Sequence, residues 1–279
     1  MSKVWFLTGT SKGFGRIWAE AALERGDRVA ATARDITTLD GLVDRYGDLV
    51  LPIALDVTDK AAVDAAVAQA HAHFGRLDVV VNNAGYGLFG MIEEISEEQA
   101  RAQLETNVFG ALWVTQAALP FLREQRSGHI LQVSSIGGVN AFPTLGLYHA
   151  SKWALEGFSQ SLAQEVAPFG VHVTLIEPTG FSTDWRGASA VRAEPLEAYD
   201  VVRDQAAAGF ARRNPTPGDP EATAQAVLAV VDAEDPPLRL FLGDGPFEMI
   251  KGEYAKRLAE WEAWNDVAVA AHGEKAAAP

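Results

Sequence analysis

The sequence contains no cysteine among its 279 residues. Disulfide bonds, zinc–thiolate sites and thiol nucleophiles are therefore excluded, and a reducing compartment is allowed. Basic residues are also scarce, with 23 lysines and arginines against 37 acidic residues and a formal net charge of −14. Because an acidic surface repels nucleic acids and anionic membranes, we predict neither as a partner.

Long apolar runs are missing as well. No uninterrupted apolar stretch in the sequence approaches the roughly 18 residues that a membrane-spanning helix needs. The opening residues, MSKVWFLTGT, lead directly into a segment of strand length and lack the pattern of a signal peptide. We therefore predict a cytoplasmic protein.

Short β-rich segments alternate with segments of helical length. The predicted strands cover residues 4–9, 28–33, 49–55, 77–82, 129–135, 171–178 and 238–243. This alternation predicts an α/β fold in which helices cover both faces of a parallel sheet. Right-handed crossovers make such a sheet doubly wound. We therefore predict a single seven-stranded, Rossmann-like sheet, with ligands bound beyond the carboxyl ends of its strands.

One catalytic domain is predicted over residues 1–265, followed by a flexible C-terminal tail at 266–279. The segment near 184–218 is less regular, and RRNPTPGDP at 212–220 would break a helix or strand. This segment is either a substrate lid or a variable surface insertion.

The stretch TGTSKGFG, residues 8–15, follows the first predicted strand and opens the first helix. Gly9, Gly13 and Gly15 allow a sharp turn and the close approach of a phosphate. The helix N-terminus then offers unpaired N–H groups and the positive end of its dipole. In a strand–turn–helix unit this pattern favours a bound dinucleotide over a tight turn without a ligand.

The end of the second strand usually distinguishes the two nicotinamide nucleotides. An acid there binds the ribose 2′-hydroxyl, whereas a basic residue accommodates a 2′-phosphate. Here Ala33 stands where the acid would be expected, Arg34 follows it, and Lys12 lies within the glycine turn. Both cations could instead be ordinary surface charges, and Asp35 could weaken the preference. The pattern favours NADP(H).

Polar residues end the next two strands. Asp56 follows the third strand, where it could accept a hydrogen bond from the adenine amino group or cap the next helix, a role that suits Thr58 or Asp59 better. The sequence NNAG, residues 82–85, ends the fourth strand. Its small residues and amides suit a backbone that lies against a ribose, and they also suit a turn tied by asparagine side chains.

The stretch YHASK, residues 148–152, holds a tyrosine and a lysine four residues apart. On a helix over 147–166, Tyr148 and Lys152 share one face. A free tyrosine has a pKa of about 10, and a lysine cation close by lowers it. The phenol can then donate a proton to a carbonyl oxygen or take one from an alcohol. Hydride transfer needs such a partner, because the carbonyl oxygen becomes an alkoxide as the hydride arrives.

Two further polar features accompany this pair. Ser134 and Ser135 close the fifth strand, where either could orient a substrate oxygen or be an ordinary strand-end serine. Asn107 lies inside an otherwise apolar helix, LETNVFGALWV. An asparagine is mildly unfavourable there, and a structural hydrogen bond is one explanation for it.

Taken together, these motifs resemble the short-chain dehydrogenase/reductase family from about Lys3 to at least Thr183. The family pattern T-G-x-x-x-G-x-G matches residues 8–15, N-N-A-G matches 82–85, and Y-x-x-x-K matches 148–152. The family's catalytic serine lies thirteen residues before the tyrosine, which selects Ser135 over Ser134. Its active-site asparagine matches Asn107.

The resemblance implies a role for each catalytic residue. Tyr148 would be the acid/base, and Lys152 would lower its pKa and bind the nicotinamide ribose. Ser135 would orient the substrate oxygen, and Asn107 would hold a water molecule of a proton relay. No metal is expected.

The resemblance also implies NADP(H) as cofactor, with Ser11 adding a hydroxyl near the 2′-phosphate. After the sixth strand the family usually has P-G, whereas this chain reads EPTGFST, with Thr179 inserted between Pro178 and Gly180. Thr183 still stands where the family's threonine binds the carboxamide. The predicted cofactor contacts are Gly9, Ser11, Lys12, Gly13, Phe14, Gly15, Arg34, Asp56, Val57, Asn83, Ala84, Gly85, Tyr148, Lys152, Pro178, Phe181 and Thr183.

The resulting prediction is an NADP(H)-dependent oxidoreductase that interconverts a carbonyl and an alcohol on a hydrophobic small molecule. The alternatives are a non-catalytic NADP(H)-binding sensor or scaffold protein, and a lyase or dehalogenase on the same scaffold. By resemblance we expect a homo-oligomer, either a dimer or a tetramer. Residues that could line the substrate pocket or pack in the core are Tyr86, Leu88, Phe89, Ile136, Val139, Phe142, Leu145 and Trp185.

Overall fold

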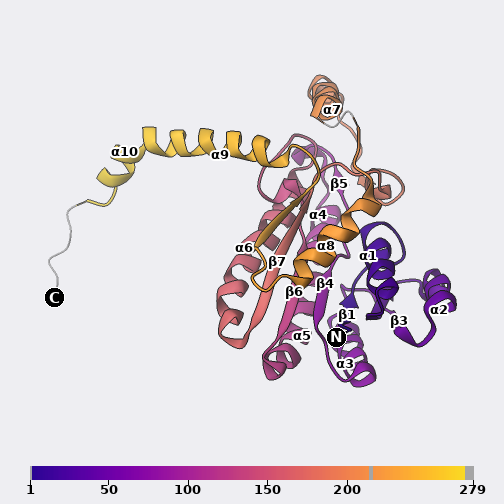
Figure 1. Ribbon diagram of the computed structural model, residues 1–279. Helices are drawn as coiled ribbons and strands as arrows, with labels where there is room; N and C mark the ends of the chain where they lie inside the picture. The colour runs from indigo at the N-terminus through magenta and orange to yellow at the C-terminus, as the bar shows by residue number, and fades with distance from the viewer. Residues whose placement is uncertain (1, 214–215, 274–279) are drawn as a thin grey trace. The chain divides into compact units, whose positions relative to one another are not determined.

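A parallel sheet forms the centre of the computed structural model, which describes residues 2–213 and 216–273. Within these residues the main sheet has seven strands in the order β3-β2-β1-β4-β6-β7-β9, as Figure 1 shows. All neighbouring strands run parallel. The strands are β1 (Val4–Leu7), β2 (Arg28–Ala33), β3 (Val50–Ala54), β4 (Val79–Asn82), β6 (Gly128–Val133), β7 (Val171–Pro178) and β9 (Arg239–Leu242). The predicted doubly wound α/β fold is confirmed.

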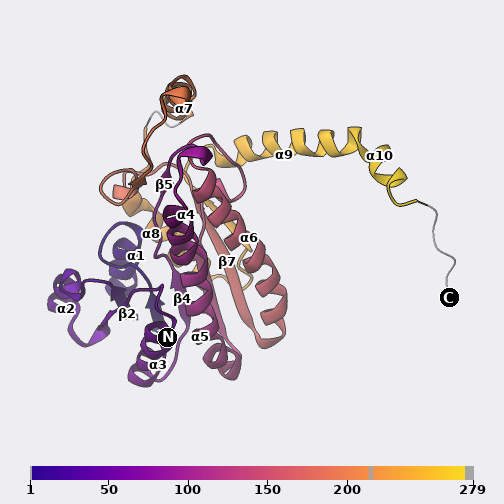
Figure 2. The ribbon, with the colours of Figure 1, turned by 180° about the vertical axis from the view of Figure 1, so that it is seen from behind.

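Alternation along the strands divides the core into two layers. In β1, Trp5 and Leu7 point into one layer while Val4 and Phe6 point into the other. All four side chains are buried, as expected for a sheet covered on both faces (Figures 1 and 2). One layer is closed by α1 (Gly13–Glu24), α2 (Asp40–Tyr46) and α8 (Thr223–Asp232). The other is closed by α3 (Lys60–Phe74), α5 (Ala111–Gln125) and α6 (Gly146–Val166).

Two features of the fold were not anticipated from the sequence. The helix predicted around Asn107 is divided into α4 (Glu97–Leu104), a π-helical turn (Glu105–Gly110) and α5. A second, two-stranded parallel sheet also pairs β5 (Leu88–Phe89) with β8 (Val191–Arg192). Both features lie beside the predicted site, since the turn carries Asn107 and the small sheet joins the loop after β4 to the segment after β7.

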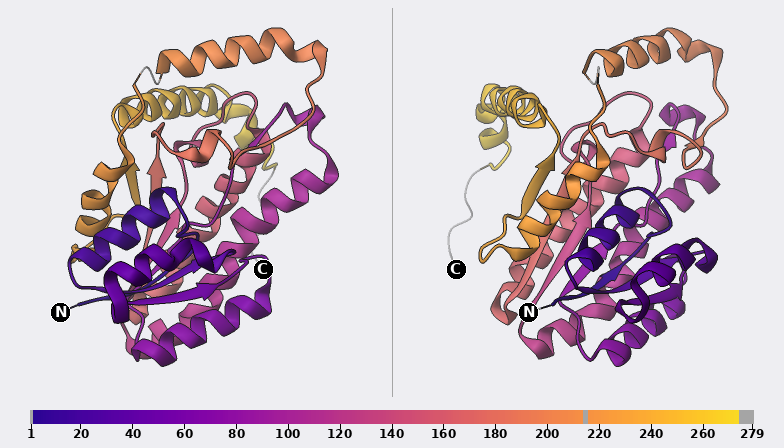
Figure 3. Two further views of the ribbon diagram at one scale, coloured as in Figure 1. Left: turned by 90° about the vertical axis from the view of Figure 1, so that its right-hand side faces the viewer. Right: turned by 45° about the vertical axis from the view of Figure 1, so that its right-hand side comes forward.

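The segment after β7 contains regular structure. It includes a 3-10 turn (Asp184–Arg186), β8 and α7 (Asp200–Arg213). Figure 3 shows α7, drawn in orange, at the end of the sheet toward which the strand arrows point. Glu94 anchors this segment, because its Oε1 accepts hydrogen bonds from the Leu196 backbone at 2.9 Å and from Arg203 at 2.7 Å.

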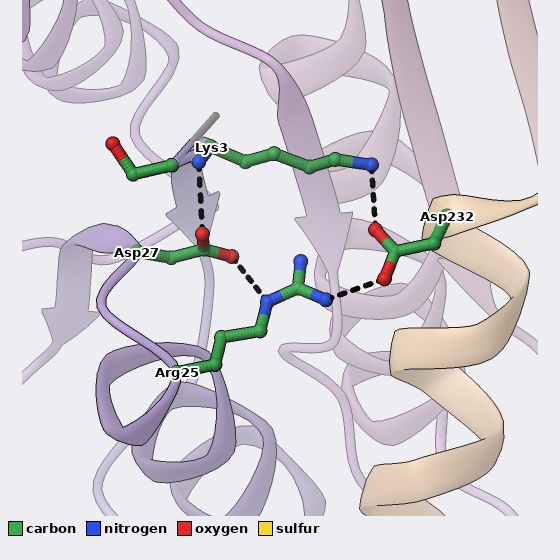
Figure 4. A pocket seen from close by; sticks show the side chains of 5 residues that line it. Lys3, Arg25, Asp27 and Asp232 are labelled. Carbon is green, nitrogen blue, oxygen red and sulfur yellow. Dashed lines mark hydrogen bonds and ion pairs between the residues drawn. The ribbon is translucent and has the colours of Figure 1, made fainter.

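At the opposite end of the sheet, four charged side chains form the network drawn in Figure 4. Arg25 lies between Asp27 and Asp232, at 2.7 and 2.8 Å, and Lys3 Nζ lies 2.8 Å from Asp232. Asp27 also accepts a hydrogen bond from Trp5 Nε1 at 2.8 Å. Two cations and two anions neutralise one another here, and they tie α8 to the first two strands.

Contacts divide the chain into one unit that ends at Asp244 and a second that begins at Gly245. The second unit contains α9 (Pro246–Ala263) and α10 (Asn265–Ala270). The predicted tail therefore begins within α10, and its residues 274–279 lie outside the described part of the chain. No helix in the described residues is both long and apolar enough to span a bilayer.

Candidate active site

The glycine turn between β1 and α1 is packed too closely for side chains at two of its positions. A Cβ atom on Gly15 would lie 2.3 Å from the Gly9 carbonyl oxygen and 2.5 Å from Asn83 Nδ2. Gly9 has a φ of +70°, and a Cβ there would lie 3.1 Å from the Ala84 Cα. Gly13, with a φ of +59°, faces open space. The glycines therefore allow both the turn and the close approach of neighbouring backbone.

The first turn of α1 is open to an anion. Lys12 is the residue before the helix, and no side chain there caps the helix N–H groups. The first turn also carries no acidic residue. Uncapped N–H groups and the positive end of the helix dipole together fit a phosphate group. Ser11, the predicted hydroxyl contact, is exposed in the same turn.

The end of β4 is tied to the glycine turn by hydrogen bonds. Thr8 Oγ1 accepts from the backbone N–H groups of Asn83 and Ala84, both at 3.0 Å. The Asn83 amide donates to the carbonyl oxygens of Thr8 and Gly9 at 2.8 and 3.0 Å. The amide of Asn83 therefore fixes the turn, which is the structural alternative that the sequence left open for NNAG.

The two predicted phosphate-binding cations differ in their surroundings. Lys12 forms an ion pair with Asp184, which lies 172 residues later in the segment after β7. Arg34 is exposed, and among residues 2–213 and 216–273 it has no acidic partner. The Asp35 carboxylate accepts hydrogen bonds from the Thr37 N–H and hydroxyl at 3.0 and 2.7 Å. Arg34 is thus the cation available to a ligand.

The third strand ends in a turn built by Asp56. Its Oδ1 accepts from the N–H and hydroxyl of Thr58 at 3.0 and 2.8 Å, while Asp59 caps α3 through the Ala62 N–H at 3.0 Å. The capping role thus belongs to Asp59 rather than to Asp56. Val57 is buried, and a Cβ on Gly110 would lie 2.6 Å from its Cγ2. This contact joins the nucleotide end of the site to the π-helical turn.

Tyr148 and Lys152 lie one turn apart on α6, and both are buried. The Lys152 Nζ is 5.8 Å from the centroid of the Tyr148 ring and donates to the Val133 carbonyl oxygen at 2.7 Å. Trp185 covers the phenol from the segment after β7, with ring centroids 5.0 Å apart. Phe89 also packs against Trp185, with ring centroids 5.1 Å apart. The phenol therefore lies between a lysine and an aromatic wall.

Burial controls the protonation of this pair. It raises the pKa of Tyr148 to about 12, against a smaller lowering by the Ser135 hydroxyl. Burial also lowers the pKa of Lys152 to about 8, and the nearby Glu156 charge opposes that change. Desolvation of the phenolate is the largest effect on the phenol, so the pKa of Tyr148 lies above its ordinary value in this structure. The role of Lys152 in lowering that pKa stays a prediction. At neutral pH Tyr148 holds its proton, which is the form that a proton donor requires.

The two serines after β6 face different surroundings. The Ser135 Oγ accepts from the Gly137 N–H at 3.0 Å, and its hydroxyl is the group that acts on Tyr148. The Ser134 Oγ is buried without a hydrogen-bond partner among the described residues, and a Cβ on Gly138 would lie 2.4 Å from it. Ser135 is thus the serine next to the phenol, as its predicted role requires.

Asn107 occupies the π-helical turn and is fully hydrogen-bonded. Its Oδ1 accepts from the Tyr86 N–H, and its Nδ2 donates to the Tyr86 carbonyl and to Ser151 Oγ, all at 3.1 Å. These contacts fit the structural explanation of this buried asparagine. A Cβ on Gly85 would lie 3.0 Å from Asn107 Oδ1 and 3.8 Å from Lys152 Nζ, so both polar groups approach the same backbone atom. The role in a proton relay stays a prediction.

The segment 178–183 follows β7 and packs beside the glycine turn. Phe181 meets the Phe14 ring edge-on at 5.4 Å, and Phe14 stacks on Trp18 at 5.3 Å. Pro178 ends β7, and the Thr183 N–H donates to the Phe181 carbonyl at 2.8 Å. The predicted cofactor contacts of the glycine turn and of the segment after β7 therefore lie next to each other.

Several neighbours of the site could not be recognised from the sequence. Asp184 had no pattern that linked it to Lys12. His149, inside YHASK, is buried with its pKa lowered to about 4, mainly by desolvation, and its Nε2 accepts from the Phe142 N–H at 3.0 Å. The sequence shows that His149 follows Tyr148, but only the structure shows its hydrogen bond with the Phe142 backbone.

Comparisons with known proteins identify the family and the fold. A family model described as "short chain dehydrogenase" matches residues 3–193. An oxidoreductase of Botryotinia fuckeliana is 44% identical over 273 residues, covering 97% of this chain and 99% of that protein. A short-chain dehydrogenase structure from Streptomyces avermitilis is 40% identical, with a TM-score of 0.89 over 97% of this chain and 98% of that one.

Two more distant solved structures contain nucleotides. An alcohol dehydrogenase from Thermococcus sibiricus, complexed with 5-hydroxy-NADP, is 26% identical, with a TM-score of 0.72 over 87% of this chain and 96% of that one. A 3-ketoacyl-(acyl-carrier-protein) reductase from Brucella melitensis, complexed with NADH, is also 26% identical, with a TM-score of 0.76 over 88% and 98%. Both kinds of nicotinamide nucleotide thus occur among similar structures.

Proposed function

The chain belongs to the short-chain dehydrogenase family of oxidoreductases, and we propose that it interconverts a carbonyl and an alcohol with NADP(H). The observation that carries this proposal is the meeting of two features at the carboxyl end of one sheet. An uncapped helix N-terminus follows the glycine turn, and a protonated phenol lies beside a serine and a lysine. The phosphates of a nucleotide need the first feature, and a carbonyl group that accepts a hydride needs the second.

The nucleotide fits the residues at the glycine turn. Gly9 and Gly15 keep that turn free of side chains, and the first N–H groups of α1 are available to a phosphate. Arg34 supports the choice of NADP(H), because it is an exposed cation without an acidic partner in the described chain. When bound, the nicotinamide would supply the hydride.

The chain's own residues would handle the proton. Tyr148 donates it from the phenol oxygen to the developing alkoxide, and Ser135 orients that oxygen with its hydroxyl. Lys152, a buried cation one turn away, stabilises the phenolate that remains. Trp185 packs over the phenol and excludes water from that side. In the reverse direction Tyr148 takes the proton from the alcohol.

The substrate class that suits this site is a hydrophobic ketone or secondary alcohol. The phenol is faced by Trp185, which packs in turn on Phe89. Aromatic walls of this kind favour apolar ligands with one polar group at the reacting atom. Residues after Thr183 would act as a lid over that ligand. The described chain does not show its partners, and we propose a cytoplasmic dimer or tetramer.

A panel of ketones with NADPH and with NADH tests the proposal, read by nicotinamide absorbance. Turnover of hydrophobic ketones, faster with NADPH, is the expected result. Binding of NADPH without turnover of any ketone or alcohol would instead favour the non-catalytic sensor. Product formation without a nucleotide would favour the lyase or dehalogenase alternative.

A further inference from the structure

Two buried carboxyl groups and an arginine lie behind Lys152, on the side away from Tyr148. Glu156 is one helical turn after the lysine on α6, Glu177 is near the end of β7, and Arg239 begins β9. Arg239 Nε lies 2.9 Å from Glu156 Oε2 and 3.5 Å from Glu177 Oε1. A second nitrogen of Arg239 donates to Gln160 Oε1 at 3.0 Å. One cation thus serves two carboxyl groups.

The two carboxyl groups are poorly placed to be ionised together. Glu177 is 0% exposed, and neither of its oxygens accepts a hydrogen bond from a described residue. Glu156 is buried too, and its Oε1 also lacks a donor among the described residues. A buried carboxylate needs donors or a cation, and two adjacent ones repel each other. The arrangement therefore favours one carboxylate and one carboxylic acid.

The contacts indicate which group carries the charge. Glu156 has the hydrogen bond to Arg239, whereas Glu177 has only the longer ion-pair contact. Burial and the Glu156 charge raise the pKa of Glu177, and Arg239 opposes them only in part. The proton therefore belongs mainly to Glu177, and the negative charge to Glu156.

The charge on Glu156 also acts on Lys152. It opposes the lowering of the Lys152 pKa by burial. The other titratable groups beside the lysine, Tyr148 and His149, are neutral near pH 7, because their pKa values are about 12 and about 4. Glu156 is thus the charged side chain that favours the protonated form of Lys152.

We propose that Glu156 and Glu177 share one proton, and that the charge left on Glu156 keeps Lys152 protonated behind the phenol. Glu156 is then a positioning residue, which acts through Lys152 and touches neither substrate nor nucleotide. This role rests on the proposed function, whereas the sharing of a proton does not. The proposal thus has one test in catalysis and one in folding.

The catalytic test compares pH profiles of kcat. Glu156→Gln removes the charge, so Lys152 loses its proton at a lower pH. The alkaline limb of kcat should then move down by about one pH unit, a usual shift for the loss of one nearby charge. Glu156→Asp keeps the charge, so its alkaline limb should lie at the wild-type pH. Glu177→Gln replaces a neutral acid by a neutral amide, so it should also leave the pH of the alkaline limb unchanged. An unmoved limb in Glu156→Gln would overturn the positioning role.

The folding test needs no substrate. Glu177 holds its proton in the folded chain and ionises when unfolded, so unfolding releases a proton and stability falls as pH rises above the ordinary pKa of a glutamic acid. Between pH 5.5 and 7.5, the ratio of the unfolding constants of wild type and Glu177→Gln should rise by up to about tenfold per pH unit. Glu165 is exposed on α6, and Glu165→Gln is the control for the loss of a carboxyl group at the surface.

The two tests fail independently. A flat ratio for Glu177→Gln would overturn the shared proton, whatever the activity of the protein. A protein that binds NADPH but reduces no ketone would overturn the proposed function. The unfolding measurements would still test whether Glu156 and Glu177 share a proton.

Discussion

Replacing Arg34 with alanine should weaken NADPH binding while leaving NADH binding nearly unchanged. Arg34 is exposed and has no acidic partner among the described residues, so its removal breaks no ion pair of that part of the chain. The neighbouring Asp35 carboxylate keeps its hydrogen bonds from Thr37 in this variant. The variant therefore isolates the interaction with a 2′-phosphate, which NADH lacks.

The size of the effect follows from the exposure of Arg34. A charge-assisted hydrogen bond contributes about 1.5–3 kcal/mol, and each 1.4 kcal/mol is about tenfold. Because an exposed pair is screened by water and salt, we expect the lower end of that range, about a tenfold fall in kcat/KM for NADPH. The difference between wild type and variant should shrink further at high ionic strength.

The assay measures kcat/KM with NADPH and NADH at fixed ionic strength, for wild type and Arg34→Ala. Lys12→Ala is the matched comparison, and it should lower both values, because it leaves the Asp184 carboxylate without its cation beside the glycine turn. An equal fall with both nucleotides in Arg34→Ala would refute the reasoning and assign the arginine to the fold. A wild type that prefers NADH would refute the cofactor assignment itself.

Three further predictions concern the proton, the serines and the glycine turn. Tyr148→Phe keeps the buried ring but removes the proton donor, so kcat should fall about 10²–10⁴-fold while the NADPH dissociation constant changes far less; near-normal turnover would contradict the mechanism. Ser135→Ala should lower kcat by about 10²–10³-fold and Ser134→Ala much less, because only Ser135 acts on the phenol. The reverse order in steady-state kinetics would assign the catalytic role to Ser134 instead. Gly15→Ala places a Cβ 2.3 Å from the Gly9 carbonyl, so it should destabilise the chain by about 1–3 kcal/mol and weaken nucleotide binding; unchanged urea unfolding and unchanged NADPH titration would show that the turn can relax.

The sequence predicted the fold well because strand periodicity and the spacing of turns are local properties. All seven predicted strands occur within two residues of their expected bounds, in one parallel sheet. The pairing of β5 with β8 was missed, since strands of two residues have no periodicity to detect. The break in the helix around Asn107 was missed for a related reason, because a π-helical turn depends on packing more than on composition.

Some features of the candidate site could likewise be predicted from the sequence, and others could not. Motif spacing by itself indicated the glycine turn and the tyrosine–lysine pair on one helical face, whereas the resemblance to the family selected Ser135. Tertiary structure alone decided that Lys12 meets Asp184, that Trp185 covers Tyr148, and that burial raises the tyrosine pKa. Contacts between residues far apart in the chain, and the desolvation that they cause, depend on how the segments pack. The spacing of residues in the sequence does not reveal that packing.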